Sequence, residues 1–243
     1  MTQSEWTREV LNDRYVIYQG KAGYRFNLDS LLLAGFVRLR RGIRVLDIGT
    51  GMGILPVLLC SKEAGLSVTA VEVLAEQAEL ARTNMDVNGL TQVTVLEQDV
   101  RLLETAHHNR YHLVLSNPPY YPSGCGQSSP DGVRRQSRHE GALRMEELVA
   151  KAWKLVAPRG RFACIYPADR VADVLRETAA AGFHPLRLRF VHPKAGRPAR
   201  VFLLEAGKDA GRQLRVEKPL VMHQDARGYN QEIERLMAGG SLD

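Results

Sequence analysis

The fold of this chain is decided by residues 45–53, which read Val-Leu-Asp-Ile-Gly-Thr-Gly-Met-Gly. The first four residues are typical of a strand buried inside a parallel sheet, and the last five hold three glycines. An apolar run from Ile54 to Cys60 follows at once, and its Pro56 falls in the first turn, where a helix tolerates proline. A strand, a glycine turn and a helix in this order predict a nucleotide-binding crossover.

Two later strands extend this pattern, at residues 67–73 and 93–99. Each ends in an acid, Glu72 and Asp99 respectively, and Glu72 lies 19 residues beyond the last glycine of the turn. An acid at about that spacing meets ribose hydroxyls at the tip of the second strand. Together with Asp47, three consecutive strands present an acid near their carboxyl ends. The series favours a nucleotide site over isolated helix caps or solvated acids.

A fourth apolar run, residues 111–116, meets the sequence Asn117-Pro118-Pro119-Tyr120. Neither proline has an N–H to give to a ladder, so the strand must end there. Pro118 also keeps the backbone of Asn117 extended, so that the Asn117 side chain and the Pro118 carbonyl can face the same space. Such a rigid pair of acceptors suits a planar amino group, whether of an adenine or of an amide.

The rest of the chain alternates helices and strands, which predicts a mostly parallel sheet covered by helices on both faces. We expect further helices at residues 30–38, 75–88, 143–156, 170–181 and 230–237, and further strands at 162–166, 183–191, 201–205 and 214–222. A short hairpin is expected over residues 15–26, with its turn at 20–23. We expect one domain over 1–243: an N-terminal hairpin and helix (1–41), a catalytic core (42–207) and a C-terminal extension (208–243).

Composition indicates a soluble protein with an anionic partner. The 243 residues carry a formal charge of +6, and the 33 basic residues comprise 26 Arg and 7 Lys. Arginine suits phosphate partners, although a GC-rich genome favours it too. No signal peptide or membrane-spanning run is visible, which predicts a cytoplasmic location. The three cysteines are scattered and the seven histidines dispersed, so we expect no metal site. Monomer and homodimer are equally compatible with the sequence.

The glycine turn indicates which nucleotide binds. Its glycines are spaced more tightly than in the GxGxxG of dinucleotide enzymes, and Asp47 lies two residues before the first of them. A carboxylate so placed would repel a pyrophosphate but attract an ammonium or sulfonium group. The cofactor that it suits is S-adenosylmethionine, whose amino-acid part is zwitterionic.

These motifs, in this order, resemble those of class I S-adenosylmethionine-dependent methyltransferases that modify exocyclic or amide nitrogens, over residues 15–207. The resemblance implies a Rossmann-like seven-stranded sheet with its last strand antiparallel. It places Gly49, Gly51 and Gly53 at the methionine end, Glu72 on the ribose and Asp99 on the adenine amino group. The cofactor-binding residues that it implies are Phe26, Asp29, Asp47, Gly49, Thr50, Gly51, Gly53, Glu72, Val73, Asp99 and Val100.

A narrower resemblance links the chain to the bacterial tRNA adenine-N6-methyltransferases that act on adenine 37, beside the anticodon of a valine tRNA. It rests on the leader at residues 18–29, on Arg138-His139-Glu140 and on residues 192–198. The chain departs from the usual leader in having Asn27 and Leu28 after Phe26. The resemblance implies N6-methylation of an adenine in tRNA.

In that reaction Asn117, Pro118, Pro119 and Tyr120 would be the catalytic residues. The Asn117 side-chain oxygen and the Pro118 carbonyl would accept the two N–H groups of the adenine, while Tyr120 would stack on its ring. Basic and aromatic residues of two loops would contact the RNA: Tyr121, Arg134, Arg135, Arg138, His139, Lys194, Arg197 and Arg200.

Other functions stay open from sequence alone. A protein-glutamine methyltransferase of the release-factor type could use the same acceptors, because a glutamine amide also presents two N–H groups. The basic loops and the lack of an N-terminal helical domain argue against it. A DNA adenine methyltransferase would need an extra target-reading domain. A non-catalytic RNA-binding protein of this fold is disfavoured by the intact Asn117 and glycine turn, and a nicotinamide dehydrogenase by Asp47.

Overall fold

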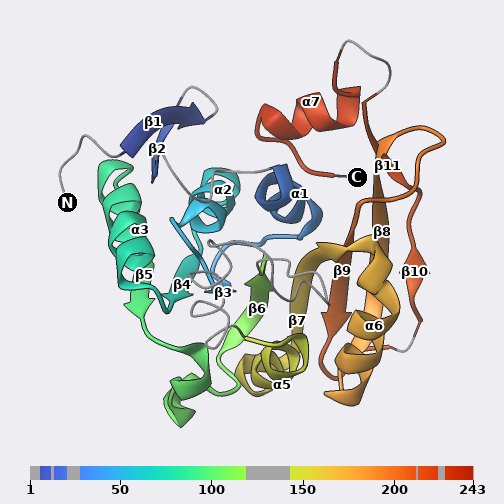
Figure 1. Cartoon of the computed structure of the whole chain (residues 1–243). Helices are drawn as coiled ribbons and strands as arrows, with labels where there is room; N and C mark the ends of the chain where they lie inside the picture. Colours follow the sequence, from blue (N-terminus) through green and yellow to red (C-terminus); the bar gives the residue numbers. More distant parts are fainter. Residues whose placement is uncertain are drawn as a thin grey trace, which may run out of the picture.

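The computed structural model describes residues 6–11, 14–20, 28–118, 143–211, 213–223 and 228–242. Its elements surround one large sheet (Figure 1). Within these ranges, no helix has the length and apolar character needed to cross a bilayer.

The sheet has the strand order β10-β8-β9-β7-β6-β3-β4-β5, and β11 pairs with β8 as well. Strand β9 runs antiparallel to β7 and β8, and the other pairings are parallel. The strands are β3 (Arg44–Ile48), β4 (Ser67–Glu72), β5 (Val93–Glu97), β6 (Tyr111–Ser116), β7 (Val156–Pro167), β8 (His184–Lys194), β9 (Val201–Gly207), β10 (Arg215–Val216) and β11 (Leu220–His223). The mostly parallel sheet with an antiparallel last core strand is thus confirmed.

The expected strand at 214–222 is instead two short strands, β10 and β11, which widen the sheet beyond seven strands. Pro219 lies between them and has no N–H to give to a ladder, so a continuous strand is interrupted there.

Helices cover both faces of the sheet, as predicted. One face packs against α1 (Leu28–Phe36), α2 (Ile54–Lys62), α3 (Ala75–Val87) and α7 (Gln231–Met237). The other packs against α5 (Met145–Leu155) and α6 (Val171–Ala180) (Figure 1). The described ranges also contain the short 3-10 turns η2 (Val100–Leu102), η3 (Thr105–His107) and η4 (Ala168–Arg170).

Strand β3 shows why these core strands read as nearly continuous apolar runs. Val45 joins the apolar cluster under α1 and α2, whereas Leu46 and Ile48 join the cluster under α5 and α6. Because successive side chains point to opposite faces and both faces are covered, every position after the exposed Arg44 is buried. Asp47 points to the same face as Val45, and it is the exception to the apolar pattern.

The N-terminal hairpin differs from the predicted one. Strand β2 (Tyr15–Gly20) pairs antiparallel with β1 (Trp6–Leu11), with Trp6 opposite Gly20. The sequence analysis expected no strand at residues 6–11, and its expected pairing with residues 24–26 falls on residues that the structure does not describe. Alternate side chains of β2 are buried, so that strand is fixed on the core and β1 takes its outer edge. Residues 21–27 lie outside the described part of the chain.

The inner edge of β2 is hydrogen-bonded by Asn84 of α3 and by Asn88, the C-cap residue of that helix. Asn84 Oδ1 accepts from Tyr18 N at 2.8 Å, and Asn84 Nδ2 donates to Tyr18 O at 3.0 Å. Asn88 makes the same pair of bonds with Val16, at 2.8 and 2.7 Å. Asn84 Nδ2 also donates to Met52 O at 2.8 Å, so one buried amide joins the hairpin to the glycine turn.

We expect Asn84→Ala to lower the free energy of unfolding by about 3 kcal/mol, because it removes three hydrogen bonds and leaves buried backbone groups of Tyr18 and Met52 without partners. Urea unfolding followed by circular dichroism would measure the change. Thr83→Ala is the matched control, because the Thr83 hydroxyl bonds only Glu79 O of its own helix at 3.0 Å on an exposed face. Equal, small losses in the two variants would contradict this role for Asn84.

The C-terminal segment is tied to β8 by two arginines of that strand. Arg189 is fully buried, and its Nη2 donates to Glu232 Oε2 of α7 at 2.9 Å. Arg187 donates through Nε to Glu217 Oε1 at 2.8 Å. Ile233 and Leu236 of α7 are also part of the apolar cluster on the α1 face. The described parts of this segment, residues 215–223 and 228–242, are therefore attached to the core.

Candidate active site

The predicted site residues gather at one edge of the sheet. Strands β3, β4, β5 and β6 are parallel neighbours, so their carboxyl ends lie together. These ends carry the glycine turn, Glu72, Asp99 and Asn117. Open α/β sheets bind ligands at this edge.

Three positions of the glycine turn have a backbone conformation that favours glycine. Gly49, Gly51 and Gly53 have φ angles of 74°, 56° and 83°, in the left-handed region that other residues rarely adopt. A Cβ on Gly53 would lie 2.8 Å from Met85 Cε of α3, whereas a Cβ on Gly49 or Gly51 would meet no atom within 4 Å. The first two glycines thus border open space where a ligand can approach the backbone.

Asp47 is a buried acid without a hydrogen-bond partner. Its side chain is fully buried, and neither carboxylate oxygen has such a partner among the described residues. Burial, helped by the nearby charge of Glu72, raises the pKa of Asp47 to about 7. The Thr50 hydroxyl lowers this pKa in part by its proximity, but its geometry is not that of a hydrogen bond. A cation at the turn would supply the missing partner.

Glu72 organises the backbone around the turn. Its Oε2 accepts from Gly51 N and its Oε1 accepts from Leu74 N, each at 2.9 Å. The carboxylate therefore fixes the middle glycine of the turn while lying at the tip of β4, where the sequence predicted a ribose contact. A carboxylate oxygen has two lone pairs, so these bonds leave it able to accept from a hydroxyl as well.

Asp99 follows β5 as predicted, but its carboxylate is held by Arg101. Arg101 donates from its backbone N to Asp99 Oδ1 at 2.8 Å and from its side chain to Oδ2 at 2.5 Å. These bonds lower the pKa of Asp99. Of the two valines in the predicted set, Val73 is exposed at the tip of β4, whereas the Val100 side chain is buried in the core. Only the backbone of Val100 is thus suited to a ligand contact.

Asn117 is held by a residue that the sequence analysis missed. Its Nδ2 donates to Ser30 Oγ of α1 at 3.0 Å. Ser30 follows Asp29 of the predicted leader directly, but 87 residues separate it from Asn117, and no local pattern joins the two. Pro118 is half-buried beside Asn117, where the predicted second acceptor carbonyl lies.

Three of the basic residues predicted to contact RNA are exposed. Lys194, Arg197 and Arg200 lie at or after the carboxyl end of β8, which is parallel to β6. They therefore share the edge of Asn117, three strand spacings away, or roughly 14 Å. Eight predicted site residues lie outside the described ranges: Phe26, Pro119, Tyr120, Tyr121, Arg134, Arg135, Arg138 and His139.

This arrangement fits S-adenosylmethionine. Asp47 and Asn117 point to the same face of neighbouring strands, because Asp47 is opposite Leu115 and Asn117 is two residues further on. Their Cα atoms are thus roughly 8 Å apart. The unpaired carboxylate suits the ammonium group, the open glycines suit the approach of the amino-acid backbone, and Glu72 suits the ribose. In the described ranges, no three His, Cys, Asp or Glu side chains are grouped to hold a metal ion.

Comparisons with known proteins agree with this geometry. The family model of the methyltransferase small domain matches residues 25–129. A tRNA1(Val) (adenine(37)-N6)-methyltransferase from Tolumonas auensis is 30% identical over 223 residues, which cover 90% of this chain and 91% of that protein. A protein of the same name from Cronobacter sakazakii is 32% identical over 78% of each chain.

Among solved structures, one named as a predicted O-methyltransferase from Agrobacterium tumefaciens matches with a TM-score of 0.71. It is 26% identical, and the match covers 88% of this chain and 98% of that one. The overall fold of this chain therefore recurs in that solved structure.

Proposed function

We propose that this chain, which belongs to the tRNA1(Val) (adenine(37)-N6)-methyltransferase family, methylates N6 of an adenine in tRNA, with adenine 37 of a valine tRNA as its target. It is an S-adenosylmethionine-dependent methyltransferase. The observation that carries the proposal is the position of Asn117, at the end of β6 beside the glycine turn, with its amide nitrogen bound to Ser30. A tRNA substrate also implies a cytoplasmic location.

The chemistry follows from the acceptors. An adenine amino group is a poor nucleophile because its lone pair is delocalised into the ring. Asn117 Oδ1 and the Pro118 carbonyl would each accept one N–H, which favours the pyramidal nitrogen whose lone pair can attack. Bound S-adenosylmethionine supplies an electrophilic methyl group on a sulfonium. N6 then gains the methyl carbon, the carbon–sulfur bond breaks to leave a neutral thioether, and one N6 proton passes to water.

The two acceptors also separate this reaction from O-methylation, the activity in the name of the Agrobacterium tumefaciens relative. A hydroxyl group has one O–H to donate, so a second acceptor beside it would have no partner. An amino group uses both acceptors. A glutamine amide would use them as well, and it is therefore an outcome that the experiment must separate.

The exposed turn that carries Lys194 and Arg197 supports a nucleic-acid substrate. These cations lie on the same edge as Asn117, where an RNA backbone that passes the site could contact them. The arginines before β3, such as Arg40 and Arg41, lie at the opposite edge of the sheet, away from Asn117. We therefore assign them no contact with the substrate.

Incubation with labelled S-adenosylmethionine and, in turn, total tRNA, release factor and duplex DNA would test this function. The tRNA should come from a strain that lacks the enzyme. Label is expected in tRNA alone, and nucleoside mass spectrometry should identify it as N6-methyladenosine. Label in protein alone would refute the tRNA assignment, and failure of the protein to bind S-adenosylmethionine in calorimetry would contradict the whole assignment.

A further inference from the structure

The orientation of the Asn117 amide matters for the proposed reaction. An amide has an acceptor at one end and donors at the other. The bond from Nδ2 to Ser30 Oγ fixes the amide plane and puts Oδ1 at the end away from α1. In the opposite orientation the amide would turn its N–H groups toward the amino group of the substrate, donor against donor.

Ser30 is well placed to hold this orientation, because it is buried and its helix is anchored from several directions. Its side chain is 3% exposed. Three consecutive carbonyls of α1, one turn further on, accept hydrogen bonds from three separate parts of the chain. These bonds run from Lys62 Nζ to Ala34 O at 2.9 Å, from Leu242 N to Gly35 O at 3.0 Å and from Arg187 Nη1 to Phe36 O at 3.1 Å.

We propose that Ser30 is a positioning residue for Asn117, and that residues 228–242 serve the site by bracing the helix that carries it. A Cβ on Gly35 would clash with Leu236 Cδ1, so α7 packs directly against α1. This proposal rests on one part of the proposed function, namely that Asn117 Oδ1 accepts a hydrogen bond from the amino group that is methylated. It does not depend on whether that group belongs to RNA or to protein.

Steady-state kinetics of Ser30→Ala and Ser30→Thr would test this role. In Ser30→Ala, kcat should fall about ten-fold, while the KM for RNA and the Kd for S-adenosylmethionine stay within about two-fold of wild type. Ser30→Thr keeps the hydroxyl and should restore most of kcat. Ser61→Ala is the matched control, because it deletes a serine hydroxyl that bonds only Leu58 O, at 2.8 Å in α2.

Three results would overturn the positioning role: an unchanged kcat in Ser30→Ala, an equal loss in Ser30→Thr with its melting temperature unchanged, or a parallel loss of S-adenosylmethionine affinity. If the wild-type enzyme methylates release factor and not tRNA, the proposed function fails. The kcat comparison is then made on that protein substrate, with the same criteria.

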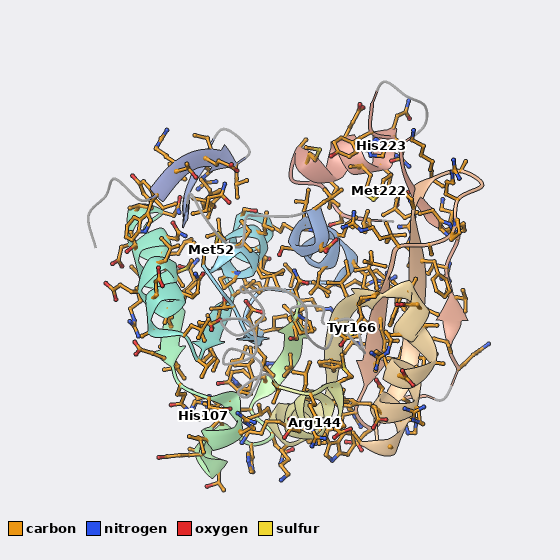
Figure 2. The ribbon with its side chains drawn as sticks, in the orientation of Figure 1. Met52, His107, Arg144, Tyr166, Met222 and His223 are labelled. Carbon is orange, nitrogen blue, oxygen red and sulfur yellow. The ribbon has the colours of Figure 1, made fainter. Side chains whose placement is uncertain are left out.

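A second inference comes from the aromatic pair at the end of β11. Strand β11 is parallel to β8, and His223 is opposite Lys194, so its carboxyl end also lies at the catalytic edge. The rings of His223 and Tyr229 are stacked, with their centroids 4.7 Å apart and their planes 22° apart. Figure 2 shows His223 at the end of β11, next to α7.

Within this pair, the Tyr229 side chain is the exposed one. Tyr229 is 37% exposed, and it is the one aromatic residue among the exposed large hydrophobic residues of the described ranges. A shallow hollow of about 430 Å³ separates the turn at Ala195 from the start of α7, and Val221 and Asn230 also line it. An exposed ring beside a basic turn is the combination that binds unpaired nucleotides.

We infer that Tyr229, backed by His223, is a stacking platform for an unpaired base of the RNA substrate. This inference deepens the proposed function by naming single-stranded loop RNA as the recognised form. Tyr229 is about four strand spacings, or roughly 19 Å, from Asn117 along the edge. A base several nucleotides from the target adenine would therefore occupy it.

Fluorescence anisotropy with a labelled tRNA anticodon stem-loop, in the absence of S-adenosylmethionine, would measure this contact. Tyr229→Ala should weaken RNA binding about ten-fold, Tyr229→Phe should leave it unchanged, and kcat at saturating RNA should stay near wild type in both. Val216→Ala, an exposed change on β10 away from the edge, is the control. Unchanged affinity in Tyr229→Ala, or an equal loss in Tyr229→Phe, would refute the platform. RNA binding without methyl transfer by wild type would refute the proposed function alone.

Discussion

Asn117→Ala is expected to reduce kcat for methyl transfer by about 10³-fold while S-adenosylmethionine binds within about two-fold of its wild-type affinity. The substitution removes Oδ1, one of the two acceptors that favour the reactive form of the amino group, and no neighbouring group replaces it. The loss should appear in single-turnover experiments with saturating RNA, because Asn117 acts on the chemical step and not on product release. Cofactor binding should survive because the glycine turn, Asp47 and Glu72 belong to β3 and β4.

Asn117→Asp separates the acceptor role from a steric one. A carboxylate keeps an oxygen at the Oδ1 position and can still accept from Ser30 Oγ–H, so this variant should retain more activity than Asn117→Ala. Ser116→Ala is a nearby control, because the Ser116 hydroxyl donates to Ile48 O inside the sheet at 2.9 Å and does not face the site. Turnover of Asn117→Ala within ten-fold of wild type would contradict the acceptor role.

The parts of the site that follow from the sequence are those encoded by local patterns. The glycine turn, Glu72 and Asp99 each follow an apolar strand, and parallel pairing brings the ends of consecutive strands together without further information. Asn117 was predictable for the same reason, because two prolines end its strand. The order of the core strands and the two helical layers follow from the alternation of elements.

The parts that the sequence analysis missed depend on contacts between distant segments. Ser30 looks like an ordinary helix residue until α1 packs over the end of β6. Nothing in the local sequence around Asn84 and Asn88 indicates that these asparagines bond the inner edge of β2. In each case a long-range contact decides the outcome, and a local propensity cannot reveal it.

Asp47 links the stability of the fold to cofactor binding. An isolated buried charge destabilises the folded state, and the folded protein avoids that cost by raising the pKa of Asp47 from 3.8 to about 7. Between these two values the folded protein keeps a proton that the unfolded chain releases. The free energy of unfolding should therefore fall as pH rises from about 4 to about 7, and this contribution should be level above pH 7.

Asp47→Asn is expected to change stability and cofactor affinity in opposite directions. At pH 8 it removes a buried charge that has no hydrogen-bond partner, so the melting temperature of the protein without cofactor should rise by about 3 °C. The same change removes the anion that we propose as the partner of the ammonium group, so S-adenosylmethionine should bind about 10²-fold more weakly in calorimetry.

In wild type, the affinity for S-adenosylmethionine should fall as pH drops below about 7, because Asp47 becomes protonated. The affinity of Asp47→Asn should lack this pH dependence. A lower melting temperature in Asp47→Asn, or an unchanged cofactor affinity, would show that Asp47 is a structural residue, because only a carboxylate kept for a ligand costs stability in the ligand's absence.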